Sequence, residues 1–327
     1  MKNQAMSRLT AACLAIMVLL TNGCSVKQYA INKLGDSLAK SGTNYASDND
    51  PELVGAALPF SLKLIEGLLE ESPKHQGLLF AASSGFTQYS YVYVQEQADE
   101  LEATDIARAT ELRDRARRLY VRGRDYGLRA LEAQHPGFGD KLRQDPRAAA
   151  AVLHKNEVPA AYWTAVSWAA VIGVSKEKPA TIAEQPQVEA LIDRAAALDP
   201  DYGAGAIDGF LISYEPARPD SRADFAKRCR SHFERAVELS HGQMASHYVA
   251  LAEAVTVQKQ DRSQFDSLLK QALAIDADQR PEWRLANLIY QRRARWLLSR
   301  EDELFVGSLD PGDQSATNSS AAQKESR

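Results

Sequence analysis

The segment spanning residues 44–97 constrains the fold of this chain most strongly, because it predicts a helical hairpin. Asp50 is a favourable N-cap residue, and Pro51 occupies the first helical position, where a missing backbone N–H costs nothing. Ser72 and Pro73 predict the end of this first helix. Apolar side chains recur at helical spacing between these limits and predict one apolar face, formed by Leu53, Ala57, Phe60, Leu64 and Leu68.

A second helix is predicted directly after this end, and so short a link requires the two helices to run antiparallel. Its apolar face is formed by Leu79, Ala82, Phe86, Tyr89 and Tyr93. Helical periodicity returns along the rest of the chain, and no run reads as a β-strand. The further predicted helices span residues 106–134, 146–155, 159–174, 188–198, 204–214, 222–239, 244–258, 262–275 and 281–298.

Several of these helices end in the same way, with Leu or Ile followed by a polar residue and a turn. Such ends lie near Leu69, Leu131, Leu198, Leu239 and Ile275. The spacing between the last three is close to the ~34 residues of a tetratricopeptide unit, and the earlier spacings are longer. We therefore predict an all-α fold, a tetratricopeptide-like array of helical hairpins (an α-solenoid) with degenerate repeats.

Composition limits the chemistry open to the chain. Its 327 residues, 45% of them hydrophobic, are enough for a substantial core. A net charge of −4 gives no basic surplus for nucleic-acid binding. Cys13, Cys24 and Cys229 are too few for a disulfide framework or a zinc cluster, so Cys229 is predicted to be a small residue on a helix face.

The N-terminal residues are organised like a bacterial export signal. Lys2 and Arg8 accompany an apolar stretch, residues 9–20, that is too short to span a bilayer comfortably. Residues 21–24 (TNGC) resemble a lipobox in which Cys24 is lipidated, although Thr21 stands where Leu is usual. A plain signal peptide and a retained membrane anchor are the alternatives.

This interpretation divides the chain into four parts. They are a lipoprotein signal peptide (1–23), a lipid-anchor linker with a short amphipathic helix (24–43), the tetratricopeptide-like helical domain (44–305) and a disordered C-terminal tail (306–327). The predicted location is the surface of a bacterial membrane, facing the periplasm. Ser25, in place of the Asp that often marks inner-membrane retention, favours the outer membrane.

The motifs of common catalytic sites are absent from the sequence. It contains no HExxH, GxSxG, P-loop or GxGxxG pattern, and its six histidines are scattered. We therefore expect no enzymatic activity, no cofactor and no metal site.

Two sets of side chains are candidates for binding. A basic run on the helix predicted at 106–134 is either a solvated face paired with Glu111, Asp114 and Asp125 or a docking surface for an acidic partner or lipid headgroups; it comprises Arg113, Arg115, Arg117, Arg118, Arg122 and Arg124. Aromatic and polar residues of the inner helices fit either an apolar ligand in a groove between stacked helices or plain core packing. They are Phe86, Gln88, Tyr89, Tyr93, Tyr162, Trp163, Trp168, Phe210 and Tyr214.

Several short stretches together resemble one known family, the tetratricopeptide-like T-component lipoproteins of TRAP-type transporters. The matching residues are Asp48 to Leu53 (DNDPEL), Ala57 to Phe60 (ALPF), Leu62 to Leu64 (LKL), Ser84 to Tyr89 (SGFTQY), Val158 to Trp163 (VPAAYW) and Arg284 to Asn287 (RLAN). The resemblance runs from the lipid-anchor cysteine to Phe305. It adds Asn287 to the candidate ligand-binding residues.

The resemblance implies a non-enzymatic accessory lipoprotein that binds a periplasmic solute-binding protein of a TRAP-type transporter. It further implies relay of a mostly apolar small molecule or an organic acid through a helical pore, and a homo-oligomer, with a trimer as the expected form. A different class of function stays open beside it. In that alternative the chain is an envelope scaffold that uses its grooves for protein–protein assembly and carries no ligand.

Overall fold

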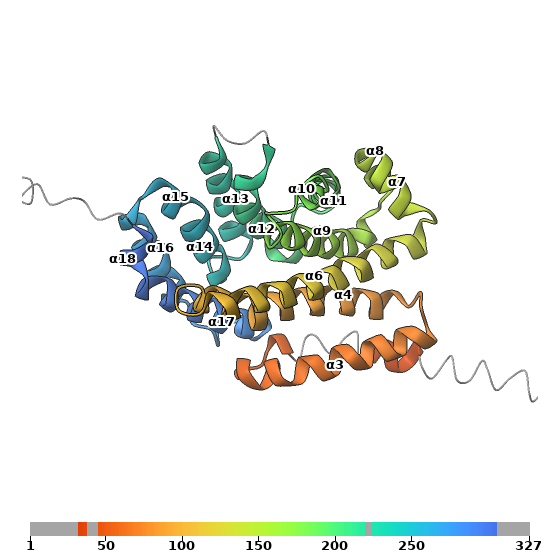
Figure 1. Cartoon of the computed structure of the whole chain (residues 1–327), viewed down its shortest axis with the longest axis horizontal. Helices are drawn as coiled ribbons and strands as arrows, with labels where there is room; N and C mark the ends of the chain where they lie inside the picture. Colours follow the sequence, from red (N-terminus) through yellow and green to blue (C-terminus); the bar gives the residue numbers. More distant parts are fainter. Residues whose placement is uncertain (1–31, 38–44, 220–223, 306–327) are drawn as a thin grey trace, which may run out of the picture.

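The computed structural model describes residues 32–37, 45–219 and 224–305 and is drawn in Figure 1. Throughout these residues the regular structure is helical and no β-strand occurs, so the predicted all-α fold class is confirmed. The signal peptide, Cys24 and the C-terminal tail lie outside the described residues. Of the predicted linker helix, residues 32–37 are described and are helical.

The predicted hairpin is formed by α3 (Pro51–Glu71) and α4 (Gln76–Ser90). Asp50 caps α3 as predicted, since its Oδ1 accepts hydrogen bonds from the backbone N–H of Glu52 and Leu53 at 3.1 and 2.9 Å. The second helix is longer than predicted. It continues without a break through a π-helical turn, η1 (Tyr91–Gln95), into α5 (Glu96–Leu101).

The apolar face predicted for α3 contacts the core only in part: Leu68 packs against core residues, but other members of the face are exposed. Phe60 is 74% exposed, Leu53 is 59% exposed and Leu64 is 38% exposed. The side chains that α3 buries are Val54, Leu62, Ile65 and Leu69. Both sets have helical spacing along the same helix, so periodicity alone could not choose between them.

After the hairpin the chain forms α6 (Ile106–Gln134), whose bounds agree with the prediction. In Figure 1, α3, α4 and α6 run side by side with α4 in the middle. Two glycines of α6 let the helices approach closely. A Cβ placed on Gly127 would lie 2.1 Å from Thr164 Oγ1 on α9, and one on Gly123 would lie 2.6 Å from Thr87 Oγ1 on α4.

Most of the remaining helices lie close to the predicted ranges, whereas residues 138–144 and 179–182 form helices that were not predicted. The remaining helices are α7 (Phe138–Gln144), α8 (Pro146–Ala151), η2 (Lys155–Glu157), α9 (Val158–Gly173), α10 (Pro179–Ile182), α11 (Gln185–Leu198), η3 (Tyr202–Ala204), α12 (Ala206–Tyr214), η4 (Glu215–Ala217), α13 (Phe225–Leu239), α14 (Ala245–Leu251), η6 (Ala252–Thr256), α15 (Val257–Lys259), α16 (Arg262–Ala274), η7 (Pro281–Trp283), α17 (Arg284–Ser299) and α18 (Glu301–Leu304). The tetratricopeptide register of these hairpins stays a prediction.

The core is divided along the array into three apolar clusters. One joins α3, α4 and α6, the second joins α9, α11 and α12, and the third joins α14, α16 and α17. Cys229 belongs to the third cluster, where its thiol is fully buried and donates to the carbonyl oxygen of Ile212. Burial raises the pKa of this thiol to about 11, which fits the predicted structural role.

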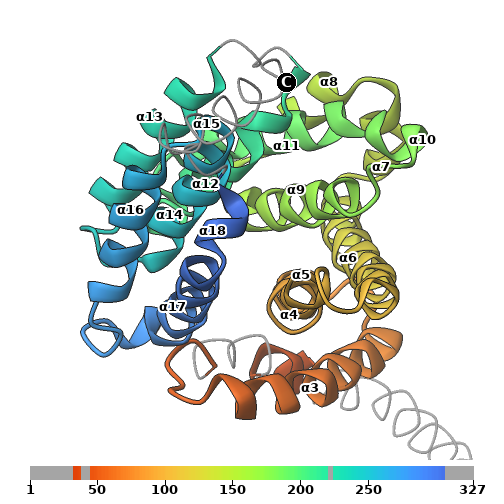
Figure 2. The ribbon, with the colours of Figure 1, turned by 60° about the vertical axis from the view of Figure 1, so that its left-hand side comes forward.

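The array curves until its end meets its beginning. Figure 2 shows α17 beside α3 and α5, although these helices lie at opposite ends of the described sequence. Arg284 on α17 donates a hydrogen bond to the carbonyl oxygen of Ser47, 237 residues earlier. The described helices therefore close into a ring, with the two ends of the array in contact.

Candidate functional site

Aromatic side chains from α9, η3 and α12 gather on one another. The ring of Tyr162 lies 5.2 Å from the ring of Trp163, 5.3 Å from that of Tyr202 and 6.5 Å from that of Phe210. The Phe210 ring stacks on Tyr214 at 5.2 Å. We call these five residues the inner aromatic cluster.

The local sequence explains how the cluster forms. Helix α9 is apolar nearly all round and packs against α4, α6, α11 and α12. After α11, Gly203 and Gly205 adopt φ values of +59° and +93°, which L-residues with side chains rarely adopt. This turn places Tyr202 beside Tyr162 and starts α12, which carries Phe210.

The inner aromatic cluster is apolar and uncharged at neutral pH. Burial raises the pKa of Tyr202 to about 12, and the Tyr162 hydroxyl donates to the carbonyl oxygen of Ala206 at 3.3 Å. Trp163, Tyr202 and Phe210 are only partly buried. An apolar surface with a few polar atoms is the kind that binds apolar small molecules.

The aromatic residues predicted on α4 do not join this cluster. Phe86 and Tyr89 of α4 and Tyr93 of η1 lie on the side of this continuous helix that faces α3 and α6. Phe86 stacks on Tyr126 of α6 with ring centres 5.9 Å apart, and the Tyr93 hydroxyl donates to the carbonyl oxygen of Pro51 at 2.7 Å. Gln88 points another way, with its side chain exposed and its amide donating to Ser84 of its own helix.

These rings line the seam between α3 and α6, where arginines of α6 lie over them. Arg115 lies over Tyr89, Arg122 over Phe86 and Arg129 over Tyr126, with the guanidinium carbon 5.8, 5.6 and 5.1 Å from the respective ring centres. We call this seam the arginine–aromatic groove; it comprises Phe86, Tyr89, Tyr126, Arg115, Arg118, Arg122 and Arg129.

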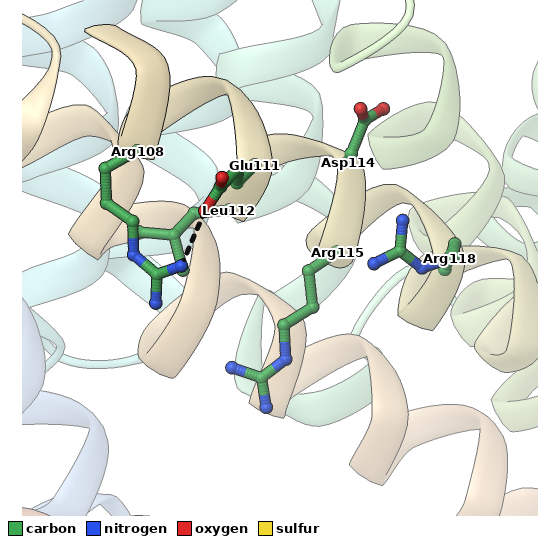
Figure 3. A pocket seen from close by; sticks show the side chains of 6 residues that line it. All are labelled: Arg108, Glu111, Leu112, Asp114, Arg115 and Arg118. Carbon is green, nitrogen blue, oxygen red and sulfur yellow. Dashed lines mark hydrogen bonds and ion pairs between the residues drawn. The ribbon is translucent and has the colours of Figure 1, made fainter. Parts of the chain in front are cut away.

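Two hollows open along the groove. One, of about 360 Å³, is drawn in Figure 3 and is lined by Arg108, Glu111, Leu112, Asp114, Arg115 and Arg118. The other, of about 550 Å³, is lined by residues of both α3 and α6, which are Lys63, Glu66, Leu69, Glu70, Pro73, Arg122, Asp125, Tyr126 and Arg129.

Glu66 anchors the α3 wall of the groove. Burial would raise the pKa of its carboxyl, but hydrogen bonds from Lys63 and Tyr126, together with the charge of Arg122, outweigh burial and lower the pKa. Glu66 therefore stays ionised and ties α3 to α6 at 2.9 Å through the Tyr126 hydroxyl.

Two further residues of the predicted set are engaged in internal contacts. The Trp168 indole N–H donates to Glu184 at 2.6 Å, and Arg124 lies over its ring. The Asn287 side-chain oxygen accepts from the backbone N–H of Ala245 at 2.9 Å, and its amide donates to the carbonyl oxygen of Gln243 at 3.0 Å. Asn287 therefore caps the start of α14, and ligand binding by either residue stays a prediction.

The sequence interpretation missed the partly buried ion pairs that join the two ends of the array. Arg293 on α17 donates to Asp99 of α5 at 3.1 Å and to Glu253 of η6 at 2.7 Å. Its neighbour Arg292 donates to Glu96, which is 2% exposed, at 3.0 Å. We call these five residues the closure junction. The sequence offered two signals for this junction: the adjacent arginines on α17 and the three-residue spacing of Glu96 and Asp99. Only the fold brings these groups together.

The electrostatics of the closure junction follow from burial. Burial raises the pKa of Glu96 to about 7, although Arg292 and Arg293 oppose the increase. Within the described residues, no group hydrogen-bonds the second carboxyl oxygen of Glu96. Glu96 begins α5 directly after η1, and Glu253 lies within η6, so both carboxylates adjoin π-helical turns, which are frequent at functional sites.

The described residues contain no group of three or more His, Cys, Asp or Glu side chains placed to hold a metal ion. None of the helices among them is both long enough and apolar enough to cross a membrane.

Comparison with known proteins identifies the family. The family model described as TRAP transporter T-component matches residues 47–305, which include every described helix from α3 to α18. This chain belongs to the TRAP transporter T-component family.

Similarity to one relative extends over almost the whole chain. The chain is similar to an uncharacterized protein of Treponema pallidum (strain Nichols), with 28% identity over 315 residues. The match covers 88% of this chain and 95% of the relative. The similarity therefore extends over nearly the full length of both chains.

Family membership assigns a coarse role to this T-component. It is an accessory component of a TRAP transport system, with a membrane-associated location in the cell envelope. The matched range also contains both the inner aromatic cluster and the closure junction.

Proposed function

We propose that this T-component is a non-enzymatic accessory lipoprotein that binds the periplasmic solute-binding protein of its TRAP transporter. The observation that carries the proposal is the family match over residues 47–305. In this proposal Cys24 is lipidated and holds the protein on a membrane surface, with the outer membrane favoured. The protein assembles as a homo-oligomer, with a trimer as the expected form.

We further propose that the T-component receives or hands over an apolar small molecule or an organic acid. The inner aromatic cluster supports this proposal, because Trp163 and Phe210 present ring surface that the core does not fully cover. A path through the ring of helices would connect this surface to the bound solute-binding protein.

The partner is tested by isolating the lipidated protein from its native membrane under mild crosslinking and identifying bound proteins by mass spectrometry. Recovery of a TRAP solute-binding protein in near-equal amount is the expected result. A Cys24→Ala variant, expressed in the same cells, should leave the membrane fraction while keeping its affinity for the purified partner. Recovery of envelope-assembly proteins instead would favour the scaffold function.

Ligand binding is tested separately with a Trp163→Ala variant. We expect this variant to stay folded and to lose uptake of hydrophobic probes, because Trp163 is partly exposed in the inner aromatic cluster. Trp168→Ala is the comparison, since that indole is 5% exposed and bonded to Glu184. Unchanged probe uptake by a folded Trp163→Ala protein would remove the cluster from the ligand path.

A further inference from the structure

The arginines of α6 lie on two sides of the helix and differ in whether a carboxylate pairs with them. On the side away from α3, each one has a carboxylate partner: Arg113 pairs with Glu102 at 2.8 Å, Arg117 with Asp114 at 3.7 Å and Arg124 with Asp125 at 2.9 Å. On the groove side, Arg108 pairs with Glu111 at 2.8 Å and Arg122 with Glu66 at 3.5 Å. Arg115, Arg118 and Arg129 have no carboxylate within ion-pair distance among the described residues. Positive charge is therefore left over in the groove.

Aromatic rings and uncharged oxygens hold two of these arginines in place. Arg115 lies over the Tyr89 ring and donates to its hydroxyl at 3.2 Å, and Arg129 lies over Tyr126 and donates to the carbonyl oxygen of Pro73 at 3.2 Å. A ring positions a guanidinium without neutralising it, and leaves other N–H groups free for an acceptor. The groove is thus preorganised for an anionic group.

The shape of the groove supports a partner segment rather than a single small anion. In Figure 3 the Arg118 side chain extends toward Arg115 across the hollow, while Asp114 points away from both. Arg118 and Arg129 are eleven residues apart, so their positions lie about 16 Å apart along the helix. A peptide segment of the partner can place carboxylates at that interval.

A protein segment also fits this surface better than a membrane. Glu66, Glu70 and Asp125 line the groove beside the arginines, so its charges alternate in sign. A negative lipid surface would cover these carboxylates as well as the arginines and be repelled by them, whereas a peptide can place its carboxylates at the arginines alone. The rings of Phe86 and Tyr89, at 3% and 9% exposure, also lie below the reach of a planar surface.

We propose that the arginine–aromatic groove docks an acidic segment of the solute-binding protein, an inference that rests on the function proposed above. Carboxylates of that segment pair with Arg115, Arg118 and Arg129, and its apolar side chains enter the hollows beside the rings. Electrostatic attraction between the arginines and the acidic segment raises the association rate of the two proteins and makes their binding salt-dependent.

The test uses the purified solute-binding protein of the same organism's TRAP transporter and measures its affinity for the T-component by calorimetry. In an R115E/R118E variant, we expect the affinity to fall by about tenfold or more and the dependence on salt to weaken. R143E/R147E is the matched control, because it changes net charge equally at two exposed arginines of α7 and α8 outside the groove. Circular dichroism checks that both variants are folded.

The outcomes separate this inference from the proposed function. If the wild type does not bind the solute-binding protein at all, both fail. If the wild type binds and R115E/R118E binds equally well, the groove proposal alone fails. If R115E/R118E instead loses adsorption to phosphatidylglycerol vesicles while keeping the protein partner, the groove is a lipid-binding surface and the proposal is overturned.

If R115E/R118E weakens binding, exchanging the charges of the groove and the partner segment tests whether they pair directly. Crosslinking through a photoreactive residue at position 118 identifies the partner peptide at the groove, which we expect to be acidic. Reversing its Asp and Glu residues to Lys should restore binding to R115E/R118E and weaken binding to the wild type. Failure of this exchange to restore any affinity would contradict direct pairing.

Discussion

The closure junction and the arginine–aromatic groove use arginine in opposite ways. At the closure junction, Arg293 is 11% exposed and lies between two carboxylates, Asp99 and Glu253. In the groove, Arg115 and Arg129 are exposed and lie over aromatic rings. The first arrangement neutralises charge inside the protein, and the second presents it to solvent.

The difference indicates what each region contributes. A buried arginine with matched carboxylates is costly to disturb, because removal of one partner leaves the other charges buried without compensation. An arginine that lies on a ring in contact with water contributes little to stability and keeps its charge available to a partner. The junction therefore holds the ring closed, whereas the groove is free to bind.

The largest expected effect is at the closure junction. Arg293→Ala removes the partner of Asp99 and Glu253 and should lower the free energy of unfolding by about 3 kcal/mol, measured by urea denaturation. Arg115→Ala should lower it by less than about 1 kcal/mol, because that side chain is exposed. Equal losses in the two variants would break the comparison.

The pH dependence of stability provides a second test of the closure junction. Because burial raises the pKa of Glu96 from 4.5 to about 7, the folded state holds this proton more tightly than the unfolded state. The contribution of Glu96 is therefore fully favourable below pH 4.5 and is lost as pH rises through 7. Glu96→Gln should gain stability relative to wild type between pH 5 and pH 8, by up to about 3 kcal/mol.

The two proteins must be compared at each pH, because His247 acts in the opposite direction. Burial lowers the pKa of His247 from 6.5 to about 4, so its contribution is present above pH 6.5 and lost as pH falls. In the wild type alone the two trends offset each other. Glu100→Gln, at an exposed position of α5, is the control for the loss of one carboxylate. If the difference in free energy of unfolding between Glu96→Gln and wild type does not change with pH, the raised pKa of Glu96 is contradicted.

The smallest expected effect is on the outer side of α3, the helix that forms one wall of the groove. Phe60→Ser should change the free energy of unfolding by less than about 0.5 kcal/mol, because the ring is 74% exposed. Leu62→Ala, at 3% exposure, should cost about 2–5 kcal/mol. Thermal or urea unfolding measures both, and a large loss for Phe60→Ser would show that this side of α3 is covered in solution.

Local sequence predicted most of the helices. The Asp50-Pro51 start, the end of α6 before Pro136 and the stop of α11 at Asp199-Pro200 all depend on backbone geometry within a few residues. Continuation of α4 through η1 into α5 was not predicted. A π-helical turn shifts the helical register, and the apolar pattern does not reveal it.

The candidate site was predicted only in part. Tyr162, Trp163 and Phe210 come together as an aromatic group, whereas Phe86, Tyr89 and Tyr93 face the other side of α4. Residue type indicated that these side chains were suited to binding. They are separated because of how α4 is rotated about its own axis. That rotation is set by packing against three helices at once, α3, α6 and α9.

The sequence by itself determined the all-α class, most of the helix limits and the family, because periodicity, caps and family motifs are carried by neighbouring residues. Tertiary structure decided which side of α3 is buried, since Leu62 and Phe60 both lie on apolar stripes of the same helix. It also decided that α17 returns to α5 and pairs Arg293 with Asp99, 194 residues away. Such contacts depend on the summed curvature of the whole array, which no local pattern records.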